Sequence, residues 1–438
     1  MLKYFKKSPP EDITLDGEAQ KKLYNKLKWQ VFFSSTLGYG LYYVCRLSLN
    51  VVKKPIVDAG ILTEVELGII GSSLFFLYAI GKLVNGFLAD HSNIKRFMSI
   101  GLLISALANL LMGFTTSFIF FAICWGLNGW TQSMGSPASI VSLSRWYKDK
   151  ERGSFYGLWS TSHNIGEALT YILTAVVVSY FGWQWGFRAA AILGIIGVLI
   201  ISFFFHDTPE SKGLPSVNED FSKKDVSTWE EQKAVLKNLH VWMLALSSGF
   251  MYISRYAVSS WGPYYFETAK GYTLTQANTL VAVSAICGIL GTACSGFVSD
   301  KFFKGNRNIP TFIFGLMNVL GLMLFLLGPK NVWWFDVIGM VVFGLAIGAL
   351  ICFLGGLIAV DIVSKKASGA ALGIVGIMSY VAAGIQDIAS GYLIENNKTI
   401  VNGKTLYDFY AITVFWIGAG ILSLICALFV WGVNNKKE

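Results

Sequence analysis

Three cationic side chains lie inside long apolar stretches of this sequence, where a charge is difficult to stabilise. Arg46, Lys82 and Arg255 are each flanked by residues that would place them within a lipid bilayer. An ionised side chain at the bilayer centre costs about 2.5–3.5 kcal/mol, so the three cations must face protein or a water-filled cavity. Only two acids, Glu167 and Asp387, lie comparably deep. One positive charge is therefore left over, and a bound anion would offset it.

The residues at helical spacing around these cations suit a phosphate group. Side chains at i, i+3, i+4 and i+7 share one face of a helix. The faces defined in this way carry Tyr39, Tyr43 and Arg46; Phe75, Tyr78 and Lys82; Tyr252, Arg255 and Ser259; and Trp159, His163 and Glu167. A guanidinium donates two parallel N–H bonds to phosphate oxygens, lysine acts as a point charge, and tyrosine or histidine adds single donors. The set predicts a phosphate site with an aromatic wall for an organic group.

Each residue also has a structural explanation. Arg46 could snorkel to the membrane surface or pair permanently with Glu167 or Asp387. Lys82 could hold a backbone carbonyl, His163 could make a structural hydrogen bond, and the tyrosines could pack between helices. The presence of two similarly placed arginines favours the binding interpretation.

The composition indicates which elements must position these residues. The 438 residues are 54% hydrophobic and 14% charged, whereas charge makes up about a quarter of soluble domains. A membrane-spanning helix needs about 20 apolar residues. On this basis we predict an all-α membrane protein with twelve transmembrane helices, near residues 29–52, 66–89, 97–115, 118–144, 154–179, 188–206, 239–266, 275–299, 310–328, 333–358, 370–394 and 406–432.

The predicted helices fall into two six-helix halves. We expect an N-terminal segment at 1–28, a first half at 29–206, a polar linker at 207–238, a second half at 239–432 and a tail at 433–438. The segments on the side of the termini contain 25 lysine and arginine residues, and the loops on the opposite side contain seven. Lys53 and Lys54 are counted among these seven. This bias predicts cytoplasmic termini. The net charge of +9 thus indicates a lipid bilayer as partner, not nucleic acid.

An internal repeat indicates that the two halves are equivalent. GFLADHSNIKR from Gly86 recurs as GFVSDKFFKGNR from Gly296, an offset of 210 residues, and Arg46 and Arg255 lie 209 apart. Transporters built from repeats bind substrate near the bilayer midplane, at the interface of the repeats. The two arginines therefore predict an anion site between the halves.

At these residues the chain resembles the major facilitator superfamily and, more narrowly, the organophosphate:phosphate antiporter family. That family includes hexose-phosphate and glycerol-3-phosphate transporters and a hexose-phosphate sensor. The resemblance covers nearly the whole chain. It includes GYGLYYVCRLSLN around Arg46, YAIGKLVNGFLADHSN around Lys82, RWYKDKERG, WSTSHNIG around His163, DTPESKGLP, YISRYAVSSWGPYY around Arg255, SDKFFKGNR and KKASGAALGIVG from Lys365.

The resemblance implies a major facilitator fold and a set of residue roles. Arg46 and Arg255 would hold the phosphate group, and Lys82, His163, Tyr39, Tyr43 and Tyr78 would line the same cavity. Rocking of the halves about this site would give alternating access.

The repeated loop motifs suggest a gate. Asp90 and Asp300 lie at helix ends beside basic residues and could form gating ion pairs; these basic residues are Arg96, Arg145 and Arg307. Alternatively, the loops are ordinary solvated positive-inside loops.

Two positions depart from the family pattern. Glu167 stands where members commonly have glycine, and Ala285 where they have an acid in the eighth helix. One hypothesis is that Glu167 replaces that acid as the partner of an arginine when no substrate is bound. The other is that Glu167 takes up a proton and couples exchange to protons.

We expect a secondary transporter in the bacterial plasma membrane that imports a hexose phosphate, glucose 6-phosphate first, in exchange for inorganic phosphate. The alternatives are a glycerol-3-phosphate:phosphate antiporter and a hexose-phosphate sensor. His163 and Glu167 could be imagined as part of an enzyme or metal site, but the chain has only four histidines. We expect no enzyme activity, no cofactor, no metal and a monomeric state.

Overall fold

The structure is a computed structural model that describes residues 3–11, 17–217, 233–304, 306–363, 367–402 and 404–431. The predicted linker at 207–238 lies partly outside the described residues, and the predicted tail at 433–438 and Lys365 lie wholly outside them. The described residues are almost entirely helical.

Two sets of helices follow one another along the chain. The first half contains α1 (Gly17–Asp58), α2 (Glu64–Asp90), α3 (Ile94–Met112), α4 (Phe118–Gln132), α5 (Gly135–Trp146), α6 (Asp149–Leu169), the π-helical turn η2 (Thr170–Thr174), α7 (Ala175–Phe181) and α8 (Trp183–Phe204). The second contains α10 (Leu239–Thr268), α11 (Leu274–Phe302), α12 (Asn308–Leu327), α13 (Trp333–Cys352), the π-helical turn η4 (Phe353–Leu357), α14 (Ile358–Asp361), α15 (Ser368–Asn396) and α16 (Tyr410–Leu428). Two short 3₁₀ turns, η1 (Lys3–Phe5) and η3 (Glu210–Lys212), flank the first half.

The sequence repeat is also visible in how helices begin. Thr63 caps α2 by accepting a hydrogen bond from the Glu66 amide, and the Glu66 carboxylate accepts one from the Thr63 amide. Thr273 and Gln276 make the same reciprocal pair at α11. Such capping boxes satisfy amides that the helix leaves free. The two capping threonines are 210 residues apart, the offset of the loop motif.

Polarity singles out the helices that carry the two arginines. Within the described residues, nine helices are long and apolar enough to cross a membrane, and α1 and α10 are not among them. Both are long, but their central turns contain several tyrosine and serine side chains and one arginine each. Polar residues inside a membrane protein usually face its interior. This composition fits helices that line the centre of the molecule.

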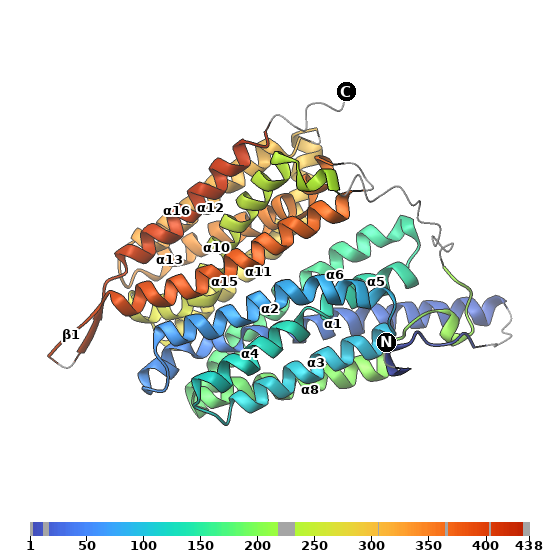
Figure 1. The fold of residues 1–438 in the computed structure, drawn as a ribbon, viewed down its shortest axis with the longest axis horizontal. Coiled ribbons are helices and arrows are strands. Elements are labelled where there is room, and N and C mark those ends of the chain that lie inside the picture. Colours follow the sequence, from blue (N-terminus) through green and yellow to red (C-terminus); the bar gives the residue numbers. More distant parts are fainter. Residues whose placement is uncertain are drawn as a thin grey trace.

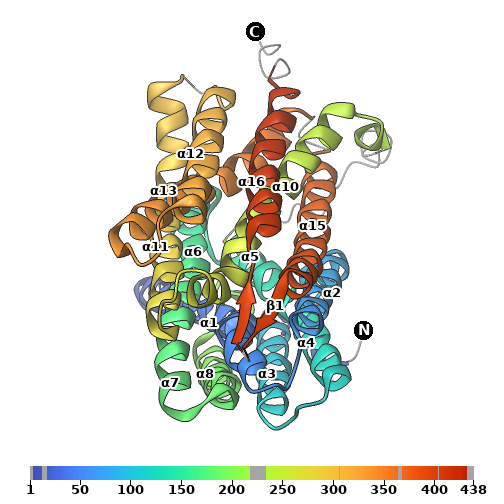
Figure 2. The same ribbon diagram turned by 90° about the vertical axis from the view of Figure 1, so that its left-hand side faces the viewer.

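A small hairpin marks one side of the molecule. β1 (Lys398–Val401) pairs antiparallel with β2 (Lys404–Tyr407), with Lys398 opposite Tyr407. It is a departure from the purely helical prediction, and it lies over the junction of the two halves in Figure 2. We call the side of the molecule that carries the hairpin the hairpin side. The opposite side, toward which the N-terminal segment lies, is the terminal side.

The halves meet on the hairpin side and diverge toward the terminal side (Figure 1). α15 shows the difference along a single helix. A Cβ atom added at Gly391 would lie 2.3 Å from the backbone oxygen of Glu64 on α2, whereas one added at Gly373 would meet nothing within 4 Å. Glycine thus permits backbone contact between α2 and α15 near the hairpin, and the other end of α15 stands clear.

The first helix is longer than the prediction. A span of 42 residues is about 60 Å long, twice the hydrocarbon core of a bilayer. The helix continues through Pro55 to Asp58. The assignment of Lys53 and Lys54 to an outer loop is therefore wrong, because both lie within α1.

Candidate anion-binding site between the halves

Arg46 is buried in a ring of tyrosines. It is 2% exposed, and its guanidinium carbon lies 4.3 Å, 5.3 Å and 5.5 Å from the ring centroids of Tyr78, Tyr43 and Tyr380. Nη2 donates a 3.1 Å hydrogen bond to the Tyr256 hydroxyl. Nε and Nη1 have no hydrogen-bond partner among the described residues. A buried donor left unpaired costs about 1–3 kcal/mol, so these two groups favour an anionic acceptor.

Arg255 reaches the same cluster from the second half. Its guanidinium carbon lies 5.4 Å from the Tyr256 ring centroid and 5.7 Å from that of Tyr252. Its Nη2 lies 3.6 Å from Oε2 of Glu167 on α6, which is longer than the roughly 2.7–2.9 Å of a charge-assisted hydrogen bond. Tyr256 thus contacts both guanidinium groups. The structure brings the two predicted arginines together between the halves, with one loosely held carboxylate.

Asp387, the other deep acid, pairs with a lysine. Its Oδ1 accepts hydrogen bonds from Lys53 Nζ at 3.1 Å and from Ser260 Oγ at 2.6 Å. Lys53 also lies 3.8 Å from the Trp261 ring centroid. The side chains of Lys53 and Asp387 are 0% and 1% exposed. Continuation of α1 beyond residue 52 therefore adds a fourth deep cation, which occupies one of the two acids.

This pairing changes the charge balance of the interior. Glu167 lies beside Arg255, and Asp387 is bound to Lys53. For Arg46, the described residues supply tyrosine rings and one hydroxyl. Four cations and two acids leave two positive charges without an acid among the described residues, at Arg46, which is buried, and at Lys82, which is exposed.

The other predicted residues surround this pair. Lys82 is exposed on α2, and its Nζ lies 5.4 Å from the Tyr380 ring centroid. The ring centroids of His163 and Tyr39 each lie 5.6 Å from that of Tyr43. Five helices, α1, α2, α6, α10 and α15, thus contribute to one cluster.

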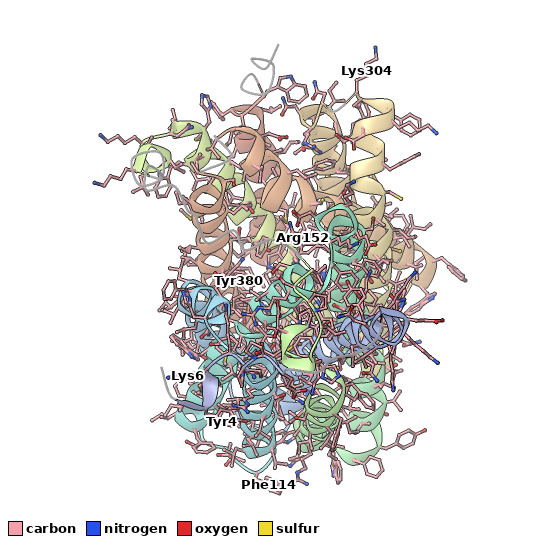
Figure 3. The ribbon with its side chains drawn as sticks, turned by 90° about the vertical axis from the view of Figure 1, so that its right-hand side faces the viewer. Tyr4, Lys6, Phe114, Arg152, Lys304 and Tyr380 are labelled. Atoms are coloured by element: carbon pink, nitrogen blue, oxygen red, sulfur yellow. The ribbon has the colours of Figure 1, made fainter. Side chains whose placement is uncertain are left out.

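Two tyrosines were missed by the sequence reasoning. Tyr256 bonds Arg46, and Tyr380 lies near Arg46 and Lys82; Figure 3 labels Tyr380 at the boundary between the halves. Tyr380 lies seven residues before Asp387, on the same helix face. That spacing was the available signal for Tyr380. Tyr256 lies 210 residues after Arg46, the offset of the loop motif, and this was the available signal for Tyr256.

In the first half, the predicted gate residue Arg145 forms its ion pair with an acid other than Asp90. Arg145 Nη1 lies 2.7 Å from Asp207 Oδ1, and its Nη2 donates to the backbone oxygen of Asp90 at 3.1 Å. Arg96 donates to the backbone oxygen of Tyr4 at 2.8 Å. The Asp90 side chain forms no ion pair within the ranges that the structure describes. In this structure Arg145 pairs with Asp207 and contacts Asp90 through its backbone oxygen, so the gating ion pair of Asp90 stays a prediction.

In the second half, the predicted gate residue Arg307 likewise pairs with an acid other than the predicted one. Arg307 Nε donates to Asp361 Oδ2 at 2.7 Å. Asp300 is exposed, and no ion pair involving it is found in the described part of the chain. Arg145 thus pairs with the first acid of the predicted linker, whereas Arg307, in the second loop motif, pairs with an acid of its own half.

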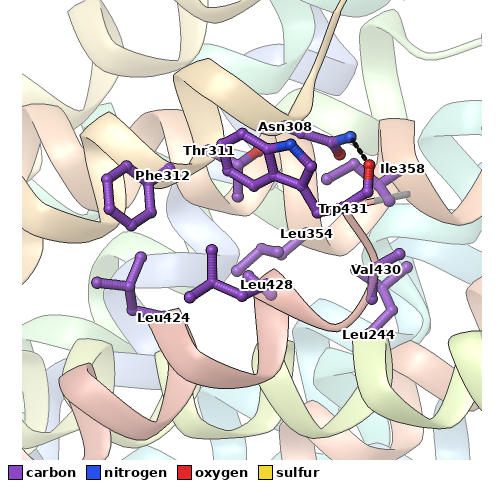
Figure 4. Close-up of a pocket in the computed structure, with 11 residues that line it drawn as sticks. Leu244, Asn308, Thr311, Phe312, Leu354, Ile358, Leu424, Leu428, Val430 and Trp431 are labelled. Atoms are coloured by element: carbon purple, nitrogen blue, oxygen red, sulfur yellow. Dashed lines mark hydrogen bonds between the residues drawn. The ribbon is translucent and has the colours of Figure 1, made fainter. Parts of the chain in front are cut away.

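A separate small pocket of about 10 Å³ lies near the terminal side of the second half (Figure 4). Its walls are mostly leucine, isoleucine and valine, and Asn308 Nδ2 donates to the backbone oxygen of Trp431 at 2.6 Å. It contains none of the predicted binding residues. Its apolar lining is unsuited to a phosphate.

Comparisons with known proteins agree with this arrangement. The model of the Major Facilitator Superfamily matches residues 32–386. A "Probable hexose phosphate transport protein" of Chlamydia pneumoniae is 36% identical, over 98% of this chain and 97% of the relative. The "Membrane sensor protein UhpC" of Escherichia coli K12 is 32% identical over 88% of this chain and 90% of the relative. The crystal structure of nucleoside transporter NupG has a TM-score of 0.72 at 17% identity, covering 93% of this chain and 99% of that one.

The chain therefore belongs to the major facilitator superfamily, and the predicted all-α membrane fold is confirmed. Within the superfamily, it is a member of the organophosphate:phosphate antiporter family. It is a multi-pass protein of a bacterial membrane in a family of organophosphate transport proteins, and it is not an enzyme.

Proposed function

We propose that this protein exchanges a hexose phosphate, glucose 6-phosphate first, for inorganic phosphate by alternating access. Relatives named as hexose phosphate transport proteins support the organic substrate. The observation that carries the phosphate assignment is Arg46, a buried guanidinium with two donors that lack a partner among the described residues. Arg255, Lys82 and the tyrosines would complete the coordination of the phosphoryl oxygens.

Phosphate suits this site because of its charge and geometry. A guanidinium can donate two parallel hydrogen bonds to one phosphate. The tyrosine rings around Arg46 exclude water, which strengthens the attraction between the guanidinium and an anion. Glu167 would then compete with substrate for Arg255 and return to it in the empty carrier.

The terminal side is assigned to the cytoplasm. The excess of lysine and arginine on that side supports this orientation. With the halves in contact on the hairpin side, the site would then be open to the cytoplasm. Reporter fusions at the C-terminus test the orientation, and activity of a periplasm-dependent reporter there would contradict it.

Phosphate counterflow into proteoliposomes tests the exchange. Arg46→Lys keeps the charge but loses the second parallel hydrogen bond, and losing a charge-assisted bond costs about 1.5–3 kcal/mol, or roughly 10- to 100-fold in apparent affinity. Arg188→Lys is the matched control, because Arg188 lies away from the site, where it donates to the backbone oxygen of Gly113 and contacts the rings of Phe114 and Trp185. Near-normal phosphate affinity in Arg46→Lys would contradict the binding role.

A sensor is the second candidate, because the chain is 32% identical to a membrane sensor protein. The same assay separates the two functions. A transporter exchanges labelled phosphate, whereas a sensor binds ligand without counterflow. A panel of competitors, including glycerol 3-phosphate, then identifies the organic substrate.

A further inference from the structure

Two asparagines from neighbouring helices bind the backbone of α1 directly beside Arg46. The backbone oxygen of Cys45, one residue earlier, accepts hydrogen bonds from Asn109 Nδ2 on α3 and from Asn128 Nδ2 on α4, each at 2.9 Å. The α-helix already supplies a backbone donor to this oxygen, so the two asparagines are not needed to satisfy it. Their bonds instead fix the position of α1 at Arg46.

The two asparagines belong to a fully paired network inside the first half. Asn109 Oδ1 accepts a hydrogen bond from Ser48 Oγ at 2.6 Å, and Asn128 Oδ1 accepts one from Ser105 Oγ at 2.6 Å. Gln132 Nε2 donates to Ser105 Oγ at 3.0 Å. All five side chains are at most 2% exposed. A buried polar network whose members are all satisfied makes the helices that it joins rigid, so α1, α3 and α4 are fixed relative to one another.

The second half does not repeat this network. Ser254 is the residue before Arg255, and Asn318 lies 209 residues after Asn109, which is the offset of the two arginines. The Ser254 hydroxyl and both amide atoms of Asn318 are buried and make no hydrogen bond to the described residues. The residues 209 positions after Ser105, Asn128 and Gln132 are apolar; they are Phe314, Val337 and Val341. Only the arginine of the first half is therefore held from behind in this way.

We propose that Asn109 and Asn128 are positioning residues, which hold Arg46 where its guanidinium can bind a phosphate group with two parallel hydrogen bonds. The proposal rests on the proposed function. Bidentate binding of phosphate depends on geometry, and a binding group must be held within about 0.5 Å of its productive place by the residues behind it. Arg46 is then the preset part of the phosphate site, whereas Arg255, 3.6 Å from Glu167, is the adjustable part.

A purely structural role for the network makes a different prediction. Loss of helix packing would lower stability and weaken phosphate binding by the same factor whatever residue occupies position 46. A positioning role acts through the Arg46 guanidinium and should disappear when that guanidinium is absent. A double-mutant cycle separates the two roles, because it measures how far the effect of one residue depends on another.

The test measures phosphate binding to the purified full-length protein by isothermal titration calorimetry. Asn109→Ala and Asn128→Ala should each weaken phosphate binding about tenfold when Arg46 is present. In the Arg46→Lys background, where the bidentate geometry is already lost, the same substitutions should weaken binding less than about threefold. If the asparagine variants do not fold, Ser105→Ala is the milder variant; it removes the hydroxyl that orients Asn128 and should weaken binding about threefold, again only with Arg46 present.

Asn308→Ala is the matched control. Asn308 is 5% exposed, and its Nδ2 donates to the backbone oxygen of Trp431, away from the phosphate cluster. This variant loses the same kind of bond but should bind phosphate with unchanged affinity. Equal losses in the Arg46 and Arg46→Lys backgrounds would overturn the positioning role, and so would losses below about threefold in both asparagine variants.

The same experiment keeps this inference apart from the proposed function. Wild-type protein that binds phosphate but shows no phosphate counterflow would contradict the exchange function, and the double-mutant cycle would still decide the role of the asparagines. Wild-type protein that does not bind phosphate would contradict both.

Discussion

The hairpin side and the terminal side place their ion pairs differently. On the hairpin side, two ion pairs join one half to the other, Lys53 with Asp387 at 3.1 Å and Glu64 with Lys398 at 2.7 Å. Two others there, Lys54 with Asp58 and Lys270 with Asp336, stay within one half. On the terminal side, the ion pairs of the described residues stay within one half; they are Lys28 with Glu151, Arg145 with Asp207, Arg152 with Asp149 and Arg307 with Asp361.

This difference shows where the halves are held together. Lys53 and Asp387 are at most 1% exposed, whereas Arg307 and Asp361 are 20% and 37% exposed. Solvated pairs contribute little to stability, whereas breaking a buried pair leaves an uncompensated charge. The halves can therefore separate on the terminal side without loss of an ion pair. Opening the hairpin side must break the ion pairs that join the halves there, so the Lys53–Asp387 pair contributes to the free-energy difference between a molecule closed on the hairpin side and one open there.

Removal of Asp387 should have the largest effect. Asp387→Asn leaves Lys53 buried without a counter-charge, at a cost of about 3–5 kcal/mol. We expect a large fall in the thermal unfolding midpoint of the purified protein and loss of phosphate counterflow. The matched variant Asp361→Asn breaks a solvated pair on the terminal side and should cost about 1 kcal/mol or less. Similar losses in the two variants would show that the sides do not differ.

A pair of glycine substitutions on α15 sharpens the comparison. Gly391→Ala forces the α2 and α15 backbones apart, because its Cβ would lie 2.3 Å from the Glu64 oxygen, and overpacking of this kind costs about 1–3 kcal/mol. Gly373→Ala meets open space and should stabilise the helix by up to about 1 kcal/mol. Thermal unfolding should therefore shift in opposite directions. A shift of the same sign in both would contradict the closed hairpin side.

The sequence was sufficient for the features that depend on local pattern. Apolar runs predicted the helices, and the 209-residue offset of Arg46 and Arg255 predicted that both belong to one site. The spare acid Glu167 does lie beside one of these arginines. These inferences needed only helical periodicity and the internal repeat.

The hairpin-side network could not be predicted in this way. Lys53 follows the expected end of a helix, beside Lys54 and Pro55, and such a lysine commonly marks a membrane surface. Its burial makes sense only once its partner Asp387, 334 residues away, is known. The offset of 210 residues relates Tyr256 to Arg46, but their hydrogen bond depends on the register of α1 against α10, which the repeat does not give.

The smallest effect on stability concerns Tyr407 and Glu64, which we call the rim of the hairpin side. The Tyr407 hydroxyl donates to Glu64 Oε1 at 2.9 Å. Burial, with the Glu64 carboxylate nearby, raises the pKa of Tyr407 to about 12, above the usual value of about 10. The contribution of Tyr407 to stability is therefore complete below about pH 10 and is lost as pH rises through about 12.

Transport should accordingly not depend on Tyr407 ionisation near neutral pH. Ultraviolet absorbance titration of the wild type minus that of Tyr407→Phe should show one tyrosine with a midpoint of about 12. A titration midpoint near the ordinary value of about 10 would mean that Tyr407 is in contact with water and that the rim is not closed around Glu64.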